Sequence, residues 1–413
     1  MVSIAYMDPG NYGTDIAAGT GYRYDLLWAG WLASGMAILL QYLSGKLGIA
    51  TGRSLPELVR SSFEGKRRYV IPYWLAAEAA AAATDLAEYL GTVLALNLLF
   101  GIPLIYAAIF GALDVIVLLA LMGRRFRLVE QYFAVLISIL VLGIFLNLLV
   151  VKPDATQTLY HSVVPYAATN GALLVAVGMV GATVMPHALF VHSWLSKNKL
   201  DAMTEKGAKD KGPTPGMEND AAEAKVHSRE EKQKARRMHL NENVVALTIA
   251  GVVNAGILLV ATPFYPGIGV TISGFVSDFS ARFGAAMGVV FVLTLLASGL
   301  SSSALGTIAG QVIMEGLLGR KWNPWARRVV TRVINVFPTT VAILIGIDPL
   351  SLLVYSQVAL SLLLPLPMIP LVYYTSKSRF MGELVNRKTT IAMAVLVVGV
   401  ILAFNLYLLG TFA

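Results

Sequence analysis

The motif Asp8-Pro9-Gly10-Asn11 places two oxygen-bearing side chains beside a helix breaker in an apolar stretch. Pro9 lacks a backbone N–H and Gly10 has a low helix propensity, so we expect a broken helix. Asp8 and Asn11 are three residues apart and can face one spot. With the freed carbonyl of Ala5 they would form an oxygen-rich cation site. The alternative is a kink in which Asp8 caps the following helix. In the middle of a membrane span, the cost of an unpaired carboxylate favours the ion site.

A second break is expected at Met185-Pro186-His187, within the apolar residues 168–196. Pro186 would leave the carbonyl of Ala182 without its helical donor. Met185 can offer a thioether, a soft ligand that suits transition metals, whereas Ca²⁺ and Mg²⁺ prefer oxygen. A methionine in an apolar helix usually serves packing. The position of Met185 beside the break strengthens the ligand interpretation.

Three carboxylates, Glu78, Asp85 and Glu88, occupy another apolar stretch, residues 69–100. Spacings of seven and three place them on roughly one stripe of a helix. Ionisable groups at membrane depth are costly and usually functional, so a proton route is the first hypothesis. The alternative is ion pairing with Arg or Lys of neighbouring helices, which stays open for Glu78.

Two further polar residues are weaker candidates. Gln357, in residues 350–374, is either an additional ligand or an amide that packs between helices. His192 follows His187 by five residues, about 140° around a helix, so we do not expect the two to share one ion.

The elements that carry these residues are predicted to be membrane spans. Of the 413 residues, 56% are apolar and 14% are charged, where soluble proteins have about 25% charged residues. This composition excludes a disordered, fibrous or ordinary cytosolic protein. The absence of cysteine excludes disulfides, iron–sulfur clusters, thiolate zinc sites and cysteine nucleophiles. The net charge of +8 lies in short loops, so no nucleic-acid partner is expected.

We predict an all-α polytopic membrane protein with eleven transmembrane helices. Most apolar segments are long enough to cross about 30 Å of hydrocarbon. No regular alternation is seen, which argues against a membrane β-barrel. The approximate limits are 1–19, 26–50, 69–100, 103–122, 128–151, 168–196, 241–263, 283–314, 329–346, 350–374 and 390–410.

Lys and Arg are distributed very unevenly between the two sides of these segments. If odd-numbered segments run outward, 29 of the 32 basic residues lie inside, and only Arg23, Lys152 and Arg282 lie outside. The positive-inside rule then predicts a cytoplasmic N-terminus and an external C-terminus, in a cell membrane. The first segment reaches Asp8 after seven residues, so we expect a truncated N-terminus or a misassigned start.

Residues 197–240 are rich in charge and have no apolar period. We expect a mobile cytoplasmic linker, with a regulatory or lipid-binding role as the less favoured alternative.

Two broken helices with four helices between them are typical of a five-plus-five inverted repeat, in which the breaks meet at a midplane binding site. The first repeat is predicted over 1–151, covering helices 1–5. The second is predicted over 168–374, covering helices 6–10 and the linker 197–240. Residues 390–410 would form an extra helix 11.

At these residues the sequence resembles the Nramp family of proton-coupled divalent metal ion transporters. The resemblance covers nearly the whole chain, and the pairing of DPGN with MPH at two broken helices is its most specific part. It includes SIAYMDPGNYGTDIAAG at 3–19, LLQYLSGKLGIATG at 39–52, TDLAEYLGTVLALNLLFGIPL at 84–104, GMVGATVMPHALFVHS at 178–193, SGLSSSALGTIAGQVIMEGLL at 298–318 and SQVALSLLLPLPMIPL at 356–371.

The resemblance implies a LeuT-like fold and a secondary transporter that imports Mn²⁺ or Fe²⁺, and also Cd²⁺, with protons by alternating access. It implies that the metal is held by Asp8, Asn11, the carbonyls of Ala5 and Ala182, Met185 and, in an occluded state, Gln357. It assigns the proton route to Asp85, Glu88, His187, Glu78 and His192.

The chain departs from the family pattern at three places. The N-terminus is short, Ala188 replaces the usual Asn after MPH, and the linker 197–240 is longer than usual. A magnesium-transporting branch differs at the methionine position, so the retained Met185 argues against that branch.

Other function classes remain as alternatives. An uncoupled divalent-metal uniporter or channel could use the same scaffold. An intramembrane metalloenzyme is disfavoured, because Asp8, Met185 and His187 lack a water-activating set such as three histidines. We therefore expect no enzymatic activity and no cofactor. The expected partners are the metal ion, the proton and the lipid bilayer. Mn²⁺ versus Fe²⁺ preference, partner proteins and oligomeric state stay open.

Overall fold

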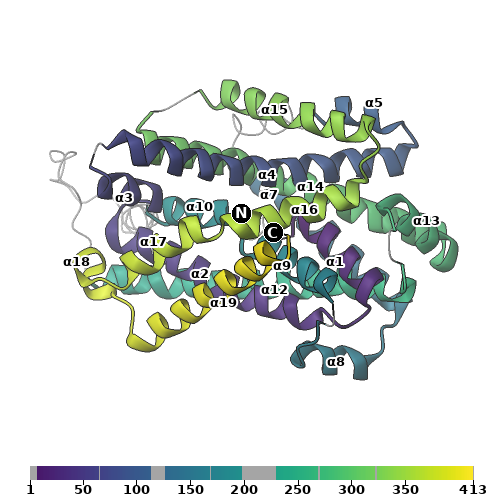
Figure 1. Cartoon of the computed structure of the whole chain (residues 1–413), viewed down its shortest axis with the longest axis horizontal. Coiled ribbons are helices and arrows are strands. Elements are labelled where there is room, and N and C mark those ends of the chain that lie inside the picture. Colours follow the sequence, from purple (N-terminus) through teal and green to yellow (C-terminus); the bar gives the residue numbers. More distant parts are fainter. Residues whose placement is uncertain are drawn as a thin grey trace.

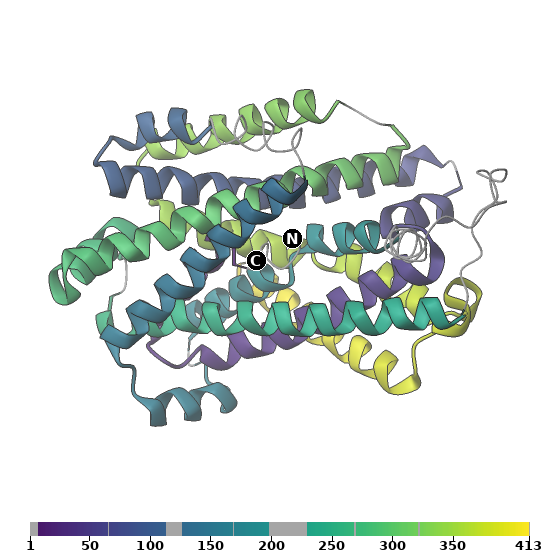
Figure 2. The same cartoon turned by 180° about the vertical axis from the view of Figure 1, so that it is seen from behind.

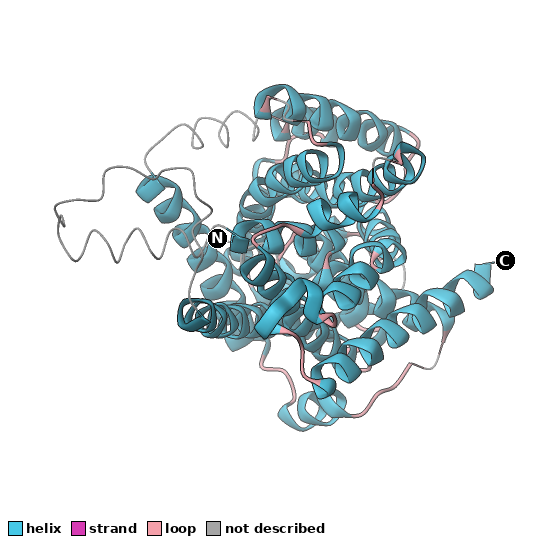
Figure 3. Cartoon of the chain, turned by 90° about the vertical axis from the view of Figure 1, so that its left-hand side faces the viewer, coloured by secondary structure: helices cyan, strands magenta, loops and turns pink. Residues whose placement is uncertain are grey.

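The computed structural model describes residues 7–64, 66–112, 126–167, 169–197, 229–267, 270–320 and 323–412. The regular secondary structure of these residues is entirely helical (Figure 3). In chain order the helices are α1 (Pro9–Tyr22), α2 (Leu27–Thr51), α3 (Leu55–Ser62), α4 (Arg67–Phe100), α5 (Leu104–Gly111), α7 (Phe126–Val151), α8 (Ala155–Val163), α9 (Asn170–Val184), α10 (Pro186–Lys197), α12 (Arg229–Ala261), α13 (Ile272–Phe283), α14 (Ala285–Leu318), α15 (Pro324–Leu344), α16 (Pro349–Leu363), α17 (Pro365–Thr375), α18 (Ser378–Met381) and α19 (Lys388–Phe412), with the short 3-10 turns η2 (Thr262–Phe264) and η3 (Gly382–Leu384).

Eight helical spans among the described residues are long and apolar enough to cross a membrane. They are Leu27–Thr51, Arg67–Phe100, Gln131–Val151, Asn170–Lys197, Arg229–Phe264, Ala285–Leu318, Pro349–Thr375 and Lys388–Gly410. The other three predicted segments correspond to α1, to α5 and to α15. Of these, α1 is described from Pro9, and residues 113–125, which follow α5, lie outside the described residues. The sequence of α15 carries Arg327, Arg328 and Arg332 in its first half, which lowers its hydropathy.

The helices that carry the candidate metal ligands lie in the middle of the bundle. In Figure 1, α4 and α15 run across the top and α2, α12 and α19 across the bottom, with α1, α9, α10 and α16 between them. Seen from behind, α7 crosses α14 and α12 (Figure 2). The helices α9 and α16 pack on each other and both contact α1. The two predicted breaks therefore lie on helices that touch.

The helix break predicted at Met185-Pro186 is present, and a helix begins at Pro9, whereas residues 1–6 before it lie outside the described residues. Asp8 is the N-cap of α1, whose first residue is Pro9. The helix α9 ends at Val184 and α10 begins at Pro186, so Met185 alone separates them. A proline is tolerated at the first position of a helix, where its missing N–H would have no partner, and this explains both start points.

The close contact between α9 and α16 depends on glycine at position 181. A Cβ atom there would lie 2.0 Å from the carbonyl oxygen of Gln357 and 2.8 Å from the backbone nitrogen of Ser361. No side chain fits at these distances, so Gly181 lets two backbones touch, as small residues often do between membrane helices.

The predicted linker 197–240 is partly wrong. Residues 229–240 form the first three turns of α12, which begins at Arg229. Glu230 and Glu231 lie in its first turn, where carboxylates stabilise a helix N-terminus. Ala235 and His239 are buried on the same helix, so this part packs on the bundle. Residues 198–228 lie outside the described residues.

Short helices occupy regions that the sequence predicted only as loops. They are α3, α8, α13 and α18. Ser54 begins α3 with a capping box, and Asp154 begins α8 by accepting a hydrogen bond from the backbone N–H of Gln157 at 2.9 Å. These caps explain why short polar sequences are helical here. The limits of the two repeats, 1–151 and 168–374, stay a prediction.

Replacing Gly181 with alanine should destabilise the protein by about 1–3 kcal/mol, because α9 and α16 must separate to admit one methyl group. This loss should occur although alanine is the better helix former. The matched control is Gly399→Ala in α19, where an added Cβ meets nothing within 4 Å. Thermal melting of the purified variants in detergent measures both. Equal melting temperatures for Gly181→Ala and Gly399→Ala would show that α9 and α16 can separate without a loss of stability.

Candidate metal centre

Asp8 has two carboxylate oxygens in different situations. Its Oδ1 accepts a hydrogen bond from the backbone N–H of Asn11 at 2.9 Å, so the capping interpretation from the sequence is confirmed. Its Oδ2 is buried and has no hydrogen-bond partner. One oxygen thus fixes the helix start while the other is left for a ligand. An uncompensated buried carboxylate is costly, and a bound cation or proton would remove that cost.

Met185 holds the second break in a conformation that few non-glycine residues adopt. Its φ of 52° is positive, which costs about 1–3 kcal/mol and persists only where the surroundings enforce it. Two hydrogen bonds, one to the residue before Met185 and one from Met185 itself, hold this conformation. Gln41 Nε2 of α2 donates to the carbonyl of Val184 at 3.0 Å, and the N–H of Met185 donates to the carbonyl of Gly181 at 3.3 Å.

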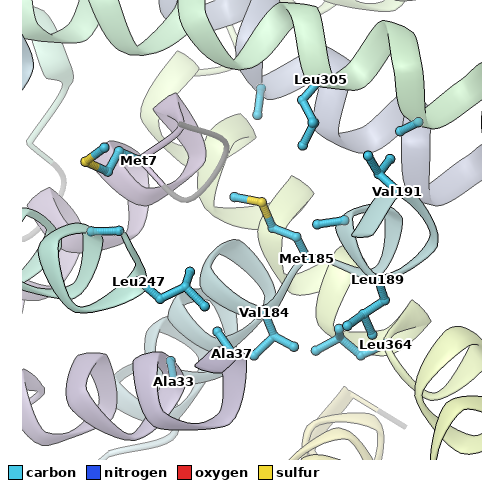
Figure 4. Close-up of a cluster of buried hydrophobic side chains, with 14 of the residues drawn as sticks. Met7, Ala33, Ala37, Val184, Met185, Leu189, Val191, Leu247, Leu305 and Leu364 are labelled. Carbon is cyan, nitrogen blue, oxygen red and sulfur yellow. The ribbon is translucent and has the colours of Figure 1, made fainter. Parts of the chain in front are cut away.

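The Met185 side chain is fully buried at this break. Figure 4 shows it between α9 and α10, with its sulfur turned away from Val184 and Leu189. Met7, which immediately precedes Asp8, belongs to the same buried cluster. The thioether therefore lies inside the protein, in the same apolar core as Met7.

The carbonyl of Ala182 loses its helical donor, as the sequence predicted. In a regular helix it would accept from the N–H of residue 186, which is Pro186 and has none. The N–H of Met185, the other nearby donor, is used by Gly181. Ala182 is fully buried, so its carbonyl is a candidate ligand beside Met185.

Gln357 connects the two breaks. Its side-chain amide lies directly over Gly10, since a Cβ on Gly10 would come within 2.3 Å of Gln357 Cδ and Nε2. Its backbone carbonyl meets Gly181, one residue before Ala182. The amide Nε2 donates to Ser356 Oγ at 3.0 Å, while the buried Oε1 has no hydrogen-bond partner. Packing and ligand roles, the two alternatives for this residue, are therefore compatible.

Five of the six predicted metal ligands belong to helices that pack on one another: α1 carries Asp8 and Asn11, α9 and its end carry Ala182 and Met185, and α16 carries Gln357. The sixth, Ala5, lies outside the described residues. No group of three or more His, Cys, Asp or Glu in the described part of the chain could hold a metal ion. The candidate centre instead combines one carboxylate with amide, carbonyl and thioether groups.

The predicted proton-route residues begin next to this centre. His187 follows Pro186, and its Nδ1 lies 3.0 Å from Thr84 Oγ1 of α4. Asp85 is the next residue of α4 and is buried. Glu88 faces α14, because a Cβ on Gly306 would lie 2.7 Å from its Oε2. One hydrogen bond therefore joins the metal-side helix α10 to the helix that carries the carboxylates.

Glu78 is ion-paired, as the alternative interpretation allowed. Its Oε2 lies 2.6 Å from Arg327 NH2 of α15, and its Oε1 accepts from Trp74 Nε1 at 3.0 Å. Glu78, Asp85 and Arg327 line one cavity of about 120 Å³ between α4, α14 and α15. The ion pair of Glu78 with Arg327 therefore shares a cavity with Asp85.

His192 lies apart from His187. Its ring centroid is 6.0 Å from that of His239 in α12, and His239 stacks on Tyr42 of α2 at 6.2 Å. The two histidines of α10 thus belong to different surroundings, as the five-residue spacing predicted.

Sequence reasoning missed two charged residues, Asp15 and Arg327. Asp15 is buried in α1, seven residues after Asp8, and its Oδ2 has no hydrogen-bond partner. The seven-residue spacing that singled out Glu78 and Asp85 would also have singled out Asp15. Arg327 begins α15 beside an inner loop, and no pattern in the sequence connects it to Glu78.

Residues 1–411 match the model of the Nramp family, described as natural resistance-associated macrophage protein-like. Two curated relatives are both named divalent metal cation transporter MntH. The relative from Granulibacter bethesdensis is 38% identical over 412 residues, which cover 99% of this chain and 86% of the relative. The relative from Bacillus subtilis is 35% identical over 416 residues, which cover 99% and 90%.

Solved structures agree with this match. A manganese transporter from Eremococcus coleocola, in complex with an aromatic bis-isothiourea compound, superposes with a TM-score of 0.84 at 30% identity, covering 98% of this chain and 84% of the other. Mhp1, a nucleobase-cation-symport-1 family transporter, superposes with a TM-score of 0.60 at 15% identity, covering 98% and 90%. The likeness to Mhp1 concerns the fold alone. The predicted LeuT-like helical fold is confirmed.

Asp8→Asn should abolish or strongly weaken Mn²⁺ binding while leaving the fold intact. Asparagine caps a helix as well as aspartate does but carries no charge. We expect at least about tenfold weaker binding in calorimetry of the purified protein, by analogy with changes around other metal sites.

The matched control for this charge removal is Asp154→Asn. Asp154 caps α8 with the same 2.9 Å hydrogen bond but is exposed. It should bind Mn²⁺ like the unmodified protein. Unchanged binding by Asp8→Asn would remove Asp8 from the candidate centre.

Proposed function

Because the chain belongs to the Nramp family, we propose that it is a secondary transporter that imports Mn²⁺ or Fe²⁺, and also Cd²⁺, together with protons. Transport of divalent metal ions is the part that the relatives and the manganese-transporter structures support directly. Ion identity, proton coupling and alternating access are the parts that this proposal adds.

The ligand types in the candidate centre support the proposed choice of ion. Asp8 supplies one negative charge and Met185 one soft sulfur, while the remaining groups are neutral oxygens. A site for Ca²⁺ or Mg²⁺ would consist of oxygen ligands alone. A thioether beside a carboxylate instead favours the softer divalent transition metals and Cd²⁺.

The position of the centre supports alternating access. The site lies at two helix breaks on α1 and α9–α10, and α16 packs against both through Gly10 and Gly181. Broken helices at a repeat interface are the usual binding sites of secondary transporters of this kind. Movement of either half-helix about its break would open the site to one side without dismantling the other.

Charge balance supports proton coupling. A divalent ion held by Asp8 alone leaves an excess positive charge, which disfavours protons on nearby groups. His187 lies two residues after Met185 and contacts Thr84, so it links the centre to Asp85 and the cavity with Glu78 and Arg327. We assign the proton movement to this path, with Glu88 and His192 as further participants.

The proposal includes a location and an orientation. The chain would span the cell membrane several times, with a cytoplasmic N-terminus and an external C-terminus. The charge bias supports this, because 29 of 32 basic residues then lie on the inner side. No catalytic chemistry is expected, since metal ion and proton are substrates that leave unchanged.

Met185→Ala should shift ion selectivity without abolishing transport. Cd²⁺ should lose the most affinity and Mn²⁺ a modest amount, because only the thioether distinguishes soft from hard ions. The relative change should be roughly 10–100-fold, by analogy with losses at other metal sites. Inhibition of Mn²⁺ uptake into proteoliposomes by Cd²⁺, Ca²⁺ and Mg²⁺ measures the effect.

Met179→Ala is the matched control, because Met179 is equally buried in α9 but lies in a different apolar cluster. It should leave the order of inhibition unchanged. If both variants show the same inhibition ratios, Met185 serves packing and selectivity arises elsewhere.

Asp85→Asn should uncouple protons from metal transport, because the amide keeps the shape but cannot carry a proton. Mn²⁺ binding should survive, while proton entry should fall in proteoliposomes that contain a pH-sensitive dye. Asp278→Asn, at an exposed position of α13, is the control for charge removal. Equal proton flux in both variants would contradict the path along α4. Metal uptake without proton flux in the unmodified protein would instead favour the uncoupled uniporter or channel.

A further inference from the structure

Three cationic side chains from distant parts of the sequence meet at one end of α2. Lys46 lies near the end of α2, Arg236 in the third turn of α12, and Arg387 immediately before α19. Lys46 contacts Asn386, the residue before Arg387, and Tyr42, one turn before Lys46 on α2, stacks on His239, three residues after Arg236. We call these three residues the basic cluster. It lies on the side that the distribution of Lys and Arg predicts to be cytoplasmic.

The cluster is held in place by neutral groups. Lys46 Nζ donates to Asn386 Oδ1 at 2.6 Å and lies 5.8 Å from the centre of the Tyr42 ring. The ring of Tyr42 also stacks on His239 of α12, with ring centroids 6.2 Å apart. Lys46 is only 4% exposed, so its ammonium cannot turn away into water. These contacts fix the direction of the charges but do not neutralise them.

The described residues place no carboxylate in an ion pair with the basic cluster. Within the described part of the chain, no ion pair joins Lys46, Arg236 or Arg387 to an acidic side chain. The nearby carboxylate of Glu383 pairs with Arg229 at 3.1 Å instead. Three like charges at close range repel one another, and burial of one of them raises the cost. A ligand that brings negative charge would remove this repulsion.

Apolar surface adjoins the cluster. On α12, Met238 is 45% exposed and Val245 is 60% exposed, and on α19 Met393 is 58% exposed. Both helices pack on α2 and lie along the lower part of the molecule in Figure 1. The ligand therefore meets cations at one end and apolar side chains along the adjoining spans. A free phosphate would satisfy the first feature but not the second.

We propose that Lys46, Arg236 and Arg387 bind the headgroup phosphate of an anionic phospholipid, whose acyl chains lie along α12 and α19. Basic pockets between membrane helices on the cytoplasmic side commonly bind such headgroups. The bound lipid would join α2, α12 and the start of α19. This inference does not depend on the transported ion or on proton coupling.

Lipid binding to the delipidated full-length chain in detergent tests the proposal. The probes are dioleoyl phosphatidylglycerol, dioleoyl phosphatidylcholine and inorganic phosphate. Native mass spectrometry counts bound lipid, and thermal melting measures stabilisation. Phosphatidylglycerol should bind in preference to phosphatidylcholine and should raise the melting temperature, while inorganic phosphate should have little effect.

The decisive comparison is between two double variants that remove the same charge. Arg236→Gln with Arg387→Gln removes two members of the cluster, and Arg237→Gln with Lys388→Gln removes the exposed neighbours. The first should bind phosphatidylglycerol roughly 25-fold more weakly, about fivefold for each cation. The second should bind within about twofold of the unmodified protein, because its exposed charges lie outside the cluster and are screened by solvent and salt.

Melting without lipid separates folding from binding. The first double variant should melt no lower than the unmodified protein, because the repulsion around Lys46 falls. If the first double variant does not fold, Arg236→Gln and Arg387→Gln are tested separately. Equal weakening in both double variants would overturn the proposal, since it would indicate general attraction to a basic surface. Stabilisation by inorganic phosphate alone would overturn it in favour of a free-anion site.

Discussion

The unpartnered Oδ2 of Asp8 is the constraint on which the centre of this structure depends. An unpaired buried carboxylate oxygen is costly in a membrane protein, so the groups around it must hold it in place. The other oxygen of Asp8 does so by capping α1, whose first residue is Pro9. Gln357 then covers Gly10 with its own unpartnered Oε1. The glycines at 10 and 181 follow from the same need, because any larger residue would separate the elements that surround the carboxylate.

Local chemistry explains which parts of the fold could be predicted from the sequence. The break at Met185 and the helix start at Pro9 are predictable because proline acts on its own helix, whatever surrounds it. The sequence does not choose between a proton route and an ion pair for Glu78, because its pairing with Arg327 depends on how α15 packs on α4. The sequence predicts a linker over residues 229–240, because their many charges outweigh the few buried residues, Ala235 and His239, on one side of the helix. Tertiary packing decides such cases, and a single sequence does not encode it locally.

Two polar systems meet at α10 without merging. On one side are the oxygens and the sulfur of the candidate metal centre, and on the other are the carboxylates of α4. The hydrogen bond between His187 and Thr84 is the described link between them. The ionisable group nearest the break is thus a histidine, whose two ring nitrogens can each take part in a hydrogen bond. The neutral Thr84 stands between His187 and the carboxylates of α4. Charge at the candidate metal centre can therefore act on α4, although the candidate ligands belong to other helices.

The helix α2 connects the centre to the membrane surface. Its Gln41 holds the carbonyl of Val184 at the break, and its Ser44 donates to the carbonyl of Leu189 in α10. Two residues later, Lys46 belongs to the basic cluster. A group that fixes this end of α2 therefore also fixes the helix that holds both flanks of the Met185 break. Any movement of α10 relative to α2 would have to exchange these hydrogen bonds for others, so α2 holds the second half-helix in the arrangement described.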